Sequence, residues 1–221
     1  MAAPGLVIFD CDGVLVDSEP LAMRVLLEAV AERGVTLDVA TGYDRFLGRS
    51  LASIRQSFAE EFGVVLDAHA LEKVRRRLFA TFEAELQPIP GIEGALSQLE
   101  TPFCVASSSQ PERIALSLRV TGLLPHFEGR LFSATMVRHG KPAPDLFLYA
   151  AAAMGHPPGA TVVIEDSPVG IAAARAAGMR ALGFLGGSHA RGQAHRAALE
   201  AQGPDAMLDD MGQLPGLLEG L

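Results

Sequence analysis

Short apolar runs alternate with longer helical patterns over much of the chain. Five of the runs are bounded by turn or polar residues and lack polar alternation, which is typical of strands buried on both faces. They are Leu6–Phe9, Phe103–Ala106, Thr161–Ile164, Ala181–Phe184 and Ala206–Leu208. Helical patterns lie between them at Ile92–Leu99, Pro111–Arg119, Leu146–Met154 and Val169–Ala177. This alternation predicts an α/β fold, a Rossmann-like doubly wound parallel sheet with helices on both faces.

The alternation stops over residues 17–86, where the pattern is helical and contains no convincing strand. From Leu71 to Phe82 the apolar positions follow a spacing of three, four and four, which is typical of a helix with one buried face. The segment Gln87–Gly91 contains two X-Pro steps, which disfavour helix, and we interpret it as a linker. The sequence therefore predicts an all-helical cap domain over residues 17–86, inserted into an α/β core domain of residues 1–16 and 87–221.

Composition and charge exclude several functions. The chain has 221 residues, with 18 Lys and Arg against 26 Asp and Glu, so that its net charge is −8. A nucleic-acid-binding protein needs a basic surface, and we expect no such partner here. The sequence shows no signal-peptide pattern, no apolar stretch near the roughly 18 residues of a membrane span, and only two cysteines, Cys11 and Cys104. We therefore expect a cytoplasmic protein without a membrane partner, and both a monomer and a weak dimer stay open.

Two aspartates follow the first predicted strand. Asp10 comes directly after the apolar run, at the end of the sheet where open α/β folds bind ligands. The two-residue period of extended chain places Asp10 and Asp12 on the same side, and Gly13 allows a sharp turn after them. The alternative is that the two carboxylates only form a turn or a helix cap.

A second acidic pair, Glu165–Asp166, follows the run Thr161–Ile164. Ser167 and Pro168 have the pattern of a helix start, which does not explain two consecutive carboxylates before them. If the two strands are neighbours, up to four carboxylates meet, and each like-charged pair about 4 Å apart costs roughly 4 kcal/mol at an effective dielectric constant near 20. Oxygen ligands without clustered His or Cys favour Mg²⁺ as the cation that offsets this repulsion.

A lysine and three serines are further candidates. Lys141 lies in a proline-flanked loop and is either a solvated side chain or a fixed cation that holds a phosphate oxygen. Ser107 follows the run Phe103–Ala106, where its hydroxyl and the nearby N–H groups can donate to an anion. Ser109 and Glu112 have the spacing of a capping box, so we expect Ser109 to be structural. The pattern assigns no role to Ser108.

In combination, these residues resemble the haloacid dehalogenase superfamily, in the branch of phosphatases and phosphomutases related to β-phosphoglucomutase. The resemblance covers nearly the whole chain and includes the position of the helical insertion. Its motifs occur in the family's order: Asp10-x-Asp12-Gly13-Val14-x-x-Asp17-Ser18, Ser107, Lys141 before a proline, and Glu165-Asp166-Ser167.

The resemblance implies a role for each residue. Asp10 would be the nucleophile that forms an aspartyl-phosphate, and Asp12 would be the general acid and base. Mg²⁺ would be bound by Asp10, by Asp166, by the backbone carbonyl of Asp12, and by Glu165 directly or through water. Ser107 and Lys141 would stabilise the transferring phosphoryl group. Further expected substrate contacts are Asp17, Ser108 and Arg49.

Mutases of this branch carry a histidine in the cap hinge and an arginine in a cap loop. The hinge here, Asp17–Ala22, contains no histidine, and the register places Leu51 rather than Arg49 at the arginine position. We therefore favour a phosphatase acting on a sugar phosphate or a sugar-acid phosphate over a phosphomutase. A phosphoryl receiver and a catalytically silent binding protein are alternatives from other classes. The six histidines show no metal-ligand spacing, and we expect them at the surface.

Overall fold

The computed structural model describes residues 3–46, 51–190 and 192–220. Six parallel strands form one sheet in the order β3-β2-β1-β4-β5-β6. The strands are β1 (Leu6–Phe9), β2 (Phe103–Ser107), β3 (Leu131–Ser133), β4 (Thr161–Glu165), β5 (Arg180–Phe184) and β6 (Ala206–Leu208). All five predicted strands are present within one residue at each end, and the predicted fold class is confirmed. The strand β3 was not predicted, because three residues are too few for an apolar pattern.

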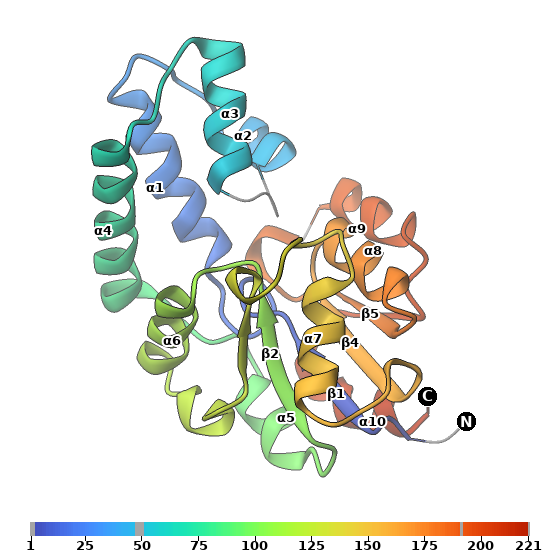
Figure 1. The fold of residues 1–221 in the computed structure, drawn as a ribbon. Coiled ribbons are helices and arrows are strands. Elements are labelled where there is room, and N and C mark those ends of the chain that lie inside the picture. Colours follow the sequence, from blue (N-terminus) through green and yellow to red (C-terminus); the bar gives the residue numbers. More distant parts are fainter. Residues whose placement is uncertain (1–2, 47–50, 191, 221) are drawn as a thin grey trace.

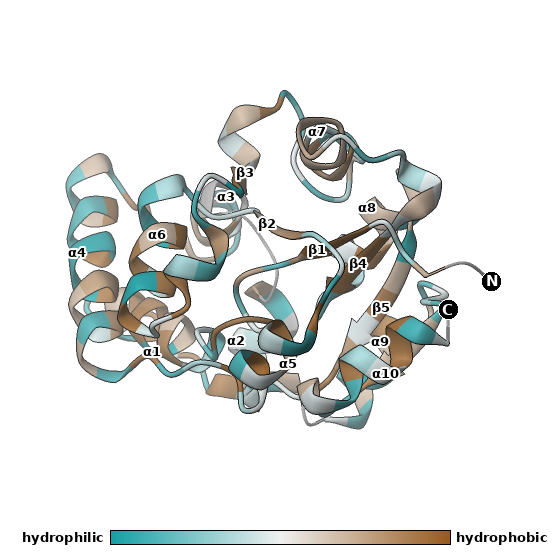
Figure 2. Ribbon diagram, turned by 90° about the horizontal axis from the view of Figure 1, so that it is seen from below, coloured by the Kyte–Doolittle hydropathy of each residue, from teal (hydrophilic) through white to brown (hydrophobic). Residues whose placement is uncertain are grey.

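Helices cover both faces of the sheet, and the face that a strand residue meets alternates along the strand. Val7 and Phe9 pack in one apolar core with α5, α6 and α10, whereas Leu6 and Ile8 pack in a second core with α7, α8 and α9. Figure 2 shows the sheet end-on, with α7 and α8 on one side of the apolar strands and α5 and α10 on the other. The helices are α5 (Ile92–Gln98), α6 (Pro111–Val120), α7 (Asp145–Ala153), α8 (Pro168–Ala176), α9 (Gln193–Glu200) and α10 (Leu214–Glu219).

Four further helices lie beyond the carboxyl ends of the strands, at the top of Figure 1. They are α1 (Glu19–Ala31), α2 (Val39–Phe46), α3 (Leu51–Phe62) and α4 (Ala68–Glu85). These helices enclose an apolar core of their own around Phe46 and Phe58, whose rings stack with centroids 4.8 Å apart. The two chain segments that lead into and out of the helices lie side by side, because Asp17 N donates to Gln87 O at 3.0 Å. The domain boundaries at residues 16 and 87 stay a prediction.

Within the described residues, none of the helices combines the length and the apolar character that crossing a membrane requires.

Candidate active site

The candidate site lies at the carboxyl ends of the central strands. Phe9 of β1 pairs with Val105 of β2 and with Ile164 of β4, so the residues that follow these three are level with one another. A cavity of about 650 Å³ opens between this edge of the sheet and the helices α1 and α4. Its lining includes the predicted site residues Asp10, Asp12, Ser107, Ser108, Lys141, Glu165 and Asp166.

Three carboxylates meet at the base of the cavity. Oxygen atoms of Asp10, Glu165 and Asp166 lie within 4.8 Å of one another, and the three residues are no more than 7% exposed. Burial raises the pKa of Asp10 well above its ordinary value; Lys141 opposes this shift, and Glu165 adds to it. Burial and the Glu165 carboxylate likewise raise the pKa of Asp166. The cluster therefore favours any added positive charge, because a cation would stabilise the ionised carboxylates.

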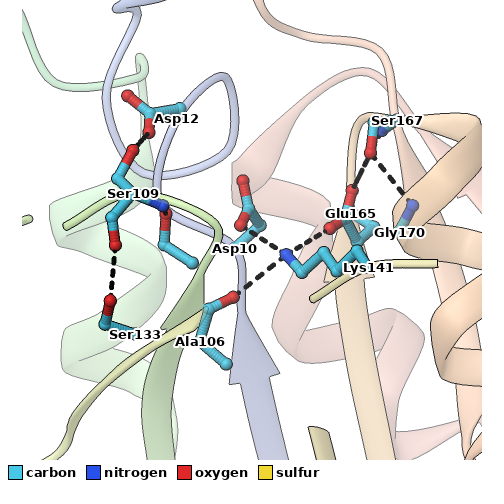
Figure 3. A network of polar contacts seen from close by, with 10 residues as sticks. Asp10, Asp12, Ala106, Ser109, Ser133, Lys141, Glu165, Ser167 and Gly170 are labelled. Atoms are coloured by element: carbon cyan, nitrogen blue, oxygen red, sulfur yellow. Dashed lines mark hydrogen bonds and ion pairs between the residues drawn. The ribbon is translucent and has the colours of Figure 1, made fainter. Parts of the chain in front are cut away.

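Lys141 supplies one such charge from within the chain. Its Nζ donates to Asp10 Oδ1 and Glu165 Oε1, both at 2.6 Å, and to the Ala106 carbonyl oxygen at 3.1 Å (Figure 3). The Lys141 side chain is only 3% exposed, which excludes the alternative of a solvated lysine. Burial disfavours its charge, but Asp10 and Glu165 outweigh burial and raise the pKa of Lys141 above its ordinary value.

The start of α8 fixes the Glu165 carboxylate. Oε2 of Glu165 accepts hydrogen bonds from Ser167 N at 3.0 Å and Ser167 Oγ at 2.8 Å. The same Ser167 Oγ accepts from Gly170 N at 3.1 Å, so the predicted helix cap is confirmed. A Cβ atom on Gly170 would lie 1.8 Å from Glu165 Cδ, and this close approach therefore requires glycine. Both oxygens of Glu165 are thus held by groups of the chain itself.

Asp12 is bound on the opposite side of the cavity, by α6 and the start of α1. Its Oδ1 accepts from Ser18 Oγ at 2.6 Å and from Arg113 Nη2 at 2.7 Å, and its Oδ2 accepts from Ser109 Oγ at 2.6 Å. Burial alone would raise the pKa of Asp12. The Arg113 charge and the hydroxyls of Ser109 and Ser18 outweigh burial and lower this pKa below its ordinary value. The carboxylate of Asp12 is therefore kept ionised and apart from the three-carboxylate cluster. The predicted contact of its backbone carbonyl with a metal stays a prediction.

The expectation that Ser109 only caps a helix is wrong. The helix α6 begins at Pro111, and its N-cap is Gln110, which makes no side-chain capping bond. Ser109 instead donates to Asp12, across 97 positions of sequence. A capping box and a hydroxyl aimed into a site have the same local pattern, and only the tertiary contact separates them.

Of the other residues that we expected to contact the substrate, some line the cavity and others do not. Ser107 is buried and accepts a hydrogen bond from Ser109 N at 3.1 Å, while Ser108 is exposed to the cavity. Asp17 does not line the cavity; its carboxylate accepts from Ser188 N at 3.0 Å and from Ser188 Oγ. Arg49 lies outside the described residues.

Three residues of the site escaped the sequence analysis. Arg113 lies over the Phe82 ring at 5.3 Å while it pairs with Asp12. Glu19 lines the cavity, and burial together with the Asp12 carboxylate raises its pKa to about 7. His189 was expected at the surface, but its side chain is fully buried and its Nε2 lies 2.9 Å from Asp166 Oδ2. The double glycine before Ser188 was the one signal for a tight turn near His189.

Comparisons with known proteins identify the family of the chain. Residues 4–178 match the haloacid dehalogenase-like hydrolase family. The chain is 34% identical over 184 residues to the 6-phosphogluconate phosphatase of Escherichia coli, covering 83% of each chain. It is 35% identical over 181 residues to a fructose-1-phosphate phosphatase of the same bacterium, covering 79% of this chain and 93% of the relative.

A solved structure extends the agreement to the whole fold. The haloacid dehalogenase-like protein of unknown function from Agrobacterium tumefaciens superposes with a TM-score of 0.86 at 38% identity, covering 98% of both chains. The predicted enzyme class, a phosphatase, is confirmed by the family and its named relatives. The chain belongs to the haloacid dehalogenase-like hydrolase family.

Proposed function

We propose that the protein is a Mg²⁺-dependent phosphatase that hydrolyses a small sugar phosphate or sugar-acid phosphate through an aspartyl-phosphate on Asp10. The observation that carries this proposal is the convergence of three buried carboxylates on one lysine at the carboxyl ends of adjacent strands. The substrate class is supported by the two Escherichia coli relatives, one a 6-phosphogluconate phosphatase and the other a fructose-1-phosphate phosphatase.

The donor atoms of the cluster are suited to Mg²⁺, since they are carboxylate oxygens without a sulfur or nitrogen ligand among them. Asp10, Asp166 and the Asp12 carbonyl would bind the ion, and Glu165 would bind it directly or through water. The bound ion would neutralise the carboxylates and draw the phosphate oxygens of the substrate towards Asp10.

The chain's own residues then divide the reaction into two steps. In the first, an oxygen of Asp10 forms a bond to phosphorus, the ester P–O bond breaks, and the leaving oxygen takes a proton from Asp12. In the second, Asp12 takes a proton from water, the water oxygen bonds to phosphorus, and the Asp10–phosphorus bond breaks to release phosphate. Lys141 and Ser107 would hold the phosphoryl oxygens during both steps, because their positive charge and hydroxyl face the same cavity.

The helices of residues 17–86 would act as a cap over this chemistry. The cavity is lined on that side by apolar residues of α1 and α4, such as Met23 and Leu78. Such a wall excludes bulk water, and we propose that it selects the part of the substrate that leaves with the ester oxygen.

A phosphate-release screen tests the proposal. Sugar phosphates, sugar-acid phosphates and nucleotides are incubated with Mg²⁺ or with EDTA, and the products are also analysed for isomers. We expect phosphate release that needs Mg²⁺ and is abolished by Asp10→Asn. The control is Asp145→Asn, which should retain phosphate release, because Asp145 pairs with the exposed His139 outside the carboxylate cluster. Phosphate release in EDTA would contradict the metal assignment, and isomers without free phosphate would indicate a mutase.

A further inference from the structure

The loop that follows β5 has no role in the function proposed above. It comprises residues 186–190, and we call it the 186–190 loop. Its backbone and hydroxyl at Ser188 bind the Asp17 carboxylate, where the chain leaves the sheet for α1. Its next residue, His189, inserts its ring beside Asp166. The loop thus contacts both the first motif and the last motif of the candidate site.

The ring of His189 is a buried polar group that lacks a hydrogen-bond partner. Its side chain has no exposed surface, and Nε2 lies 2.9 Å from Asp166 Oδ2. The direction between the two atoms is not that of a hydrogen bond, so neither ring nitrogen has a partner among the described residues. Burial of an unsatisfied polar group is costly. With Asp166 ionised, as a Mg²⁺ ligand must be, two facing lone pairs would repel, so Nε2 carries the ring proton, and a small rotation of the Asp166 carboxylate completes the bond.

Two glycines make room for this ring. A Cβ atom on Gly13 would lie 1.8 Å from Asp166 Oδ2 and 2.8 Å from His189 Cε1. A Cβ atom on Gly187 would lie 2.8 Å from the same His189 atom. The turn after β1 and the 186–190 loop therefore both approach the His189–Asp166 pair closely, and neither glycine position has room for a side chain.

We propose that His189 is a positioning residue, which donates its Nε2 proton to the Asp166 carboxylate and orients it towards Asp10 and Glu165. The inference rests on the proposed function, because it treats Asp166 as a Mg²⁺ ligand. Residues that hydrogen-bond a metal ligand fix its direction, and their loss typically weakens metal binding about 10–100-fold. The Asp17–Ser188 contact holds the 186–190 loop in place, so the start of the cap and Asp166 are coupled through this loop.

Calorimetric titration of the metal-free protein with Mg²⁺, without substrate, tests the inference. We expect His189→Leu to weaken Mg²⁺ binding about 10–100-fold, and His189→Gln to restore most of it, because a glutamine amide can place an N–H near Nε2. The matched control is His139→Leu. The His139 side chain is 61% exposed and pairs with Asp145 rather than with a residue of the carboxylate cluster, so Mg²⁺ affinity should stay near that of the wild type.

Wild-type Mg²⁺ affinity in a folded His189→Leu variant would overturn the inference. Equal losses in the Leu and Gln variants would also overturn it, because the ring would then act by packing alone. If His189→Leu does not fold, His189→Phe decides, because it keeps a flat ring without a donor: weaker Mg²⁺ binding supports the inference, and unchanged binding refutes it. Failure of the proposed function has a different signature, since the wild type itself would then bind no Mg²⁺ or release no phosphate.

Discussion

Removal of the Lys141 charge is expected to destabilise the metal-free protein strongly. Its Nζ lies 2.6 Å from oxygens of both Asp10 and Glu165, and at an effective dielectric constant of about 20 each attraction amounts to about 6 kcal/mol. The cost of burying the charges offsets much of this, and loss of one partner from a buried ion pair typically lowers the free energy of unfolding by about 3–5 kcal/mol. Lys141→Met removes the charge and keeps an apolar stem near the Phe147 ring.

Urea unfolding at pH 7.5 in EDTA, followed by circular dichroism, measures this loss. Arg24→Met is the matched control, because Arg24 contacts Glu85 at the same distance of 2.6 Å but both side chains are about half exposed, at 46% and 48%. An exposed pair of this kind contributes little to the free energy of unfolding, because solvent screens it. Equal losses in the two variants would refute the reasoning, because burial would then have no effect on the strength of the ion pair.

The pH dependence of the Lys141→Met loss provides a second check. The folded state raises the pKa of Asp10 above that of the unfolded chain, so between those two values the folded state binds more protons. Stability then falls as pH rises through this window. Without Lys141, the pKa of Asp10 in the folded state rises further, because no positive charge of the cluster opposes burial. Asp10 of the variant then takes up a proton at pH 5 and no longer needs the lysine, so the loss of stability in Lys141→Met should be smaller at pH 5 than at pH 7.5. Added Mg²⁺ should recover part of the stability at pH 7.5.

Three further variants test other contacts of the site. Gly170→Ala should lower the free energy of unfolding by about 1–3 kcal/mol in urea titrations, since its Cβ would overlap the Glu165 carboxylate. Glu19→Gln should stabilise the protein at pH 8 by at most about 3 kcal/mol, and less at pH 5, because the wild-type carboxyl, with its pKa of about 7, is already protonated there. Arg113→Met should raise the pKa of Asp12 and shift the alkaline limb of the kcat/KM profile for sugar phosphates to higher pH.

The sequence predicted those parts of the molecule that depend on neighbouring residues. The buried strands were recognisable because both faces are covered, and the acidic motifs were recognisable because they directly follow such strands. The pairing of Phe9 with Ile164 then brings Asp10 and Glu165 together without any further information. The strand β3 was missed, since three residues at the edge of the sheet carry too little pattern.

The residues that escaped prediction have their partners far away in the sequence. Ser109 and Arg113 both bind Asp12, about a hundred positions earlier, and His189 contacts Asp166 from the loop after the next strand. A helical period shows which face of α6 is apolar, but it does not show which polar residue at the rim of that face turns inward. Local patterns therefore predict the carboxylates of the site and leave open which groups control their charge.

Neighbouring groups give the two aspartates of the first motif opposite pKa shifts. Asp10 lies among carboxylates and its pKa is raised, whereas Asp12, two residues later, binds Arg113 and two hydroxyls and its pKa is lowered. Different environments are how one kind of side chain takes different roles in a site. An ionised Asp12 is ready to accept a proton from water but must gain one before it can protonate a leaving oxygen. The Arg113 pair therefore favours the second step of the proposed reaction and slows the first, so Arg113→Met should accelerate formation of the aspartyl-phosphate relative to its hydrolysis.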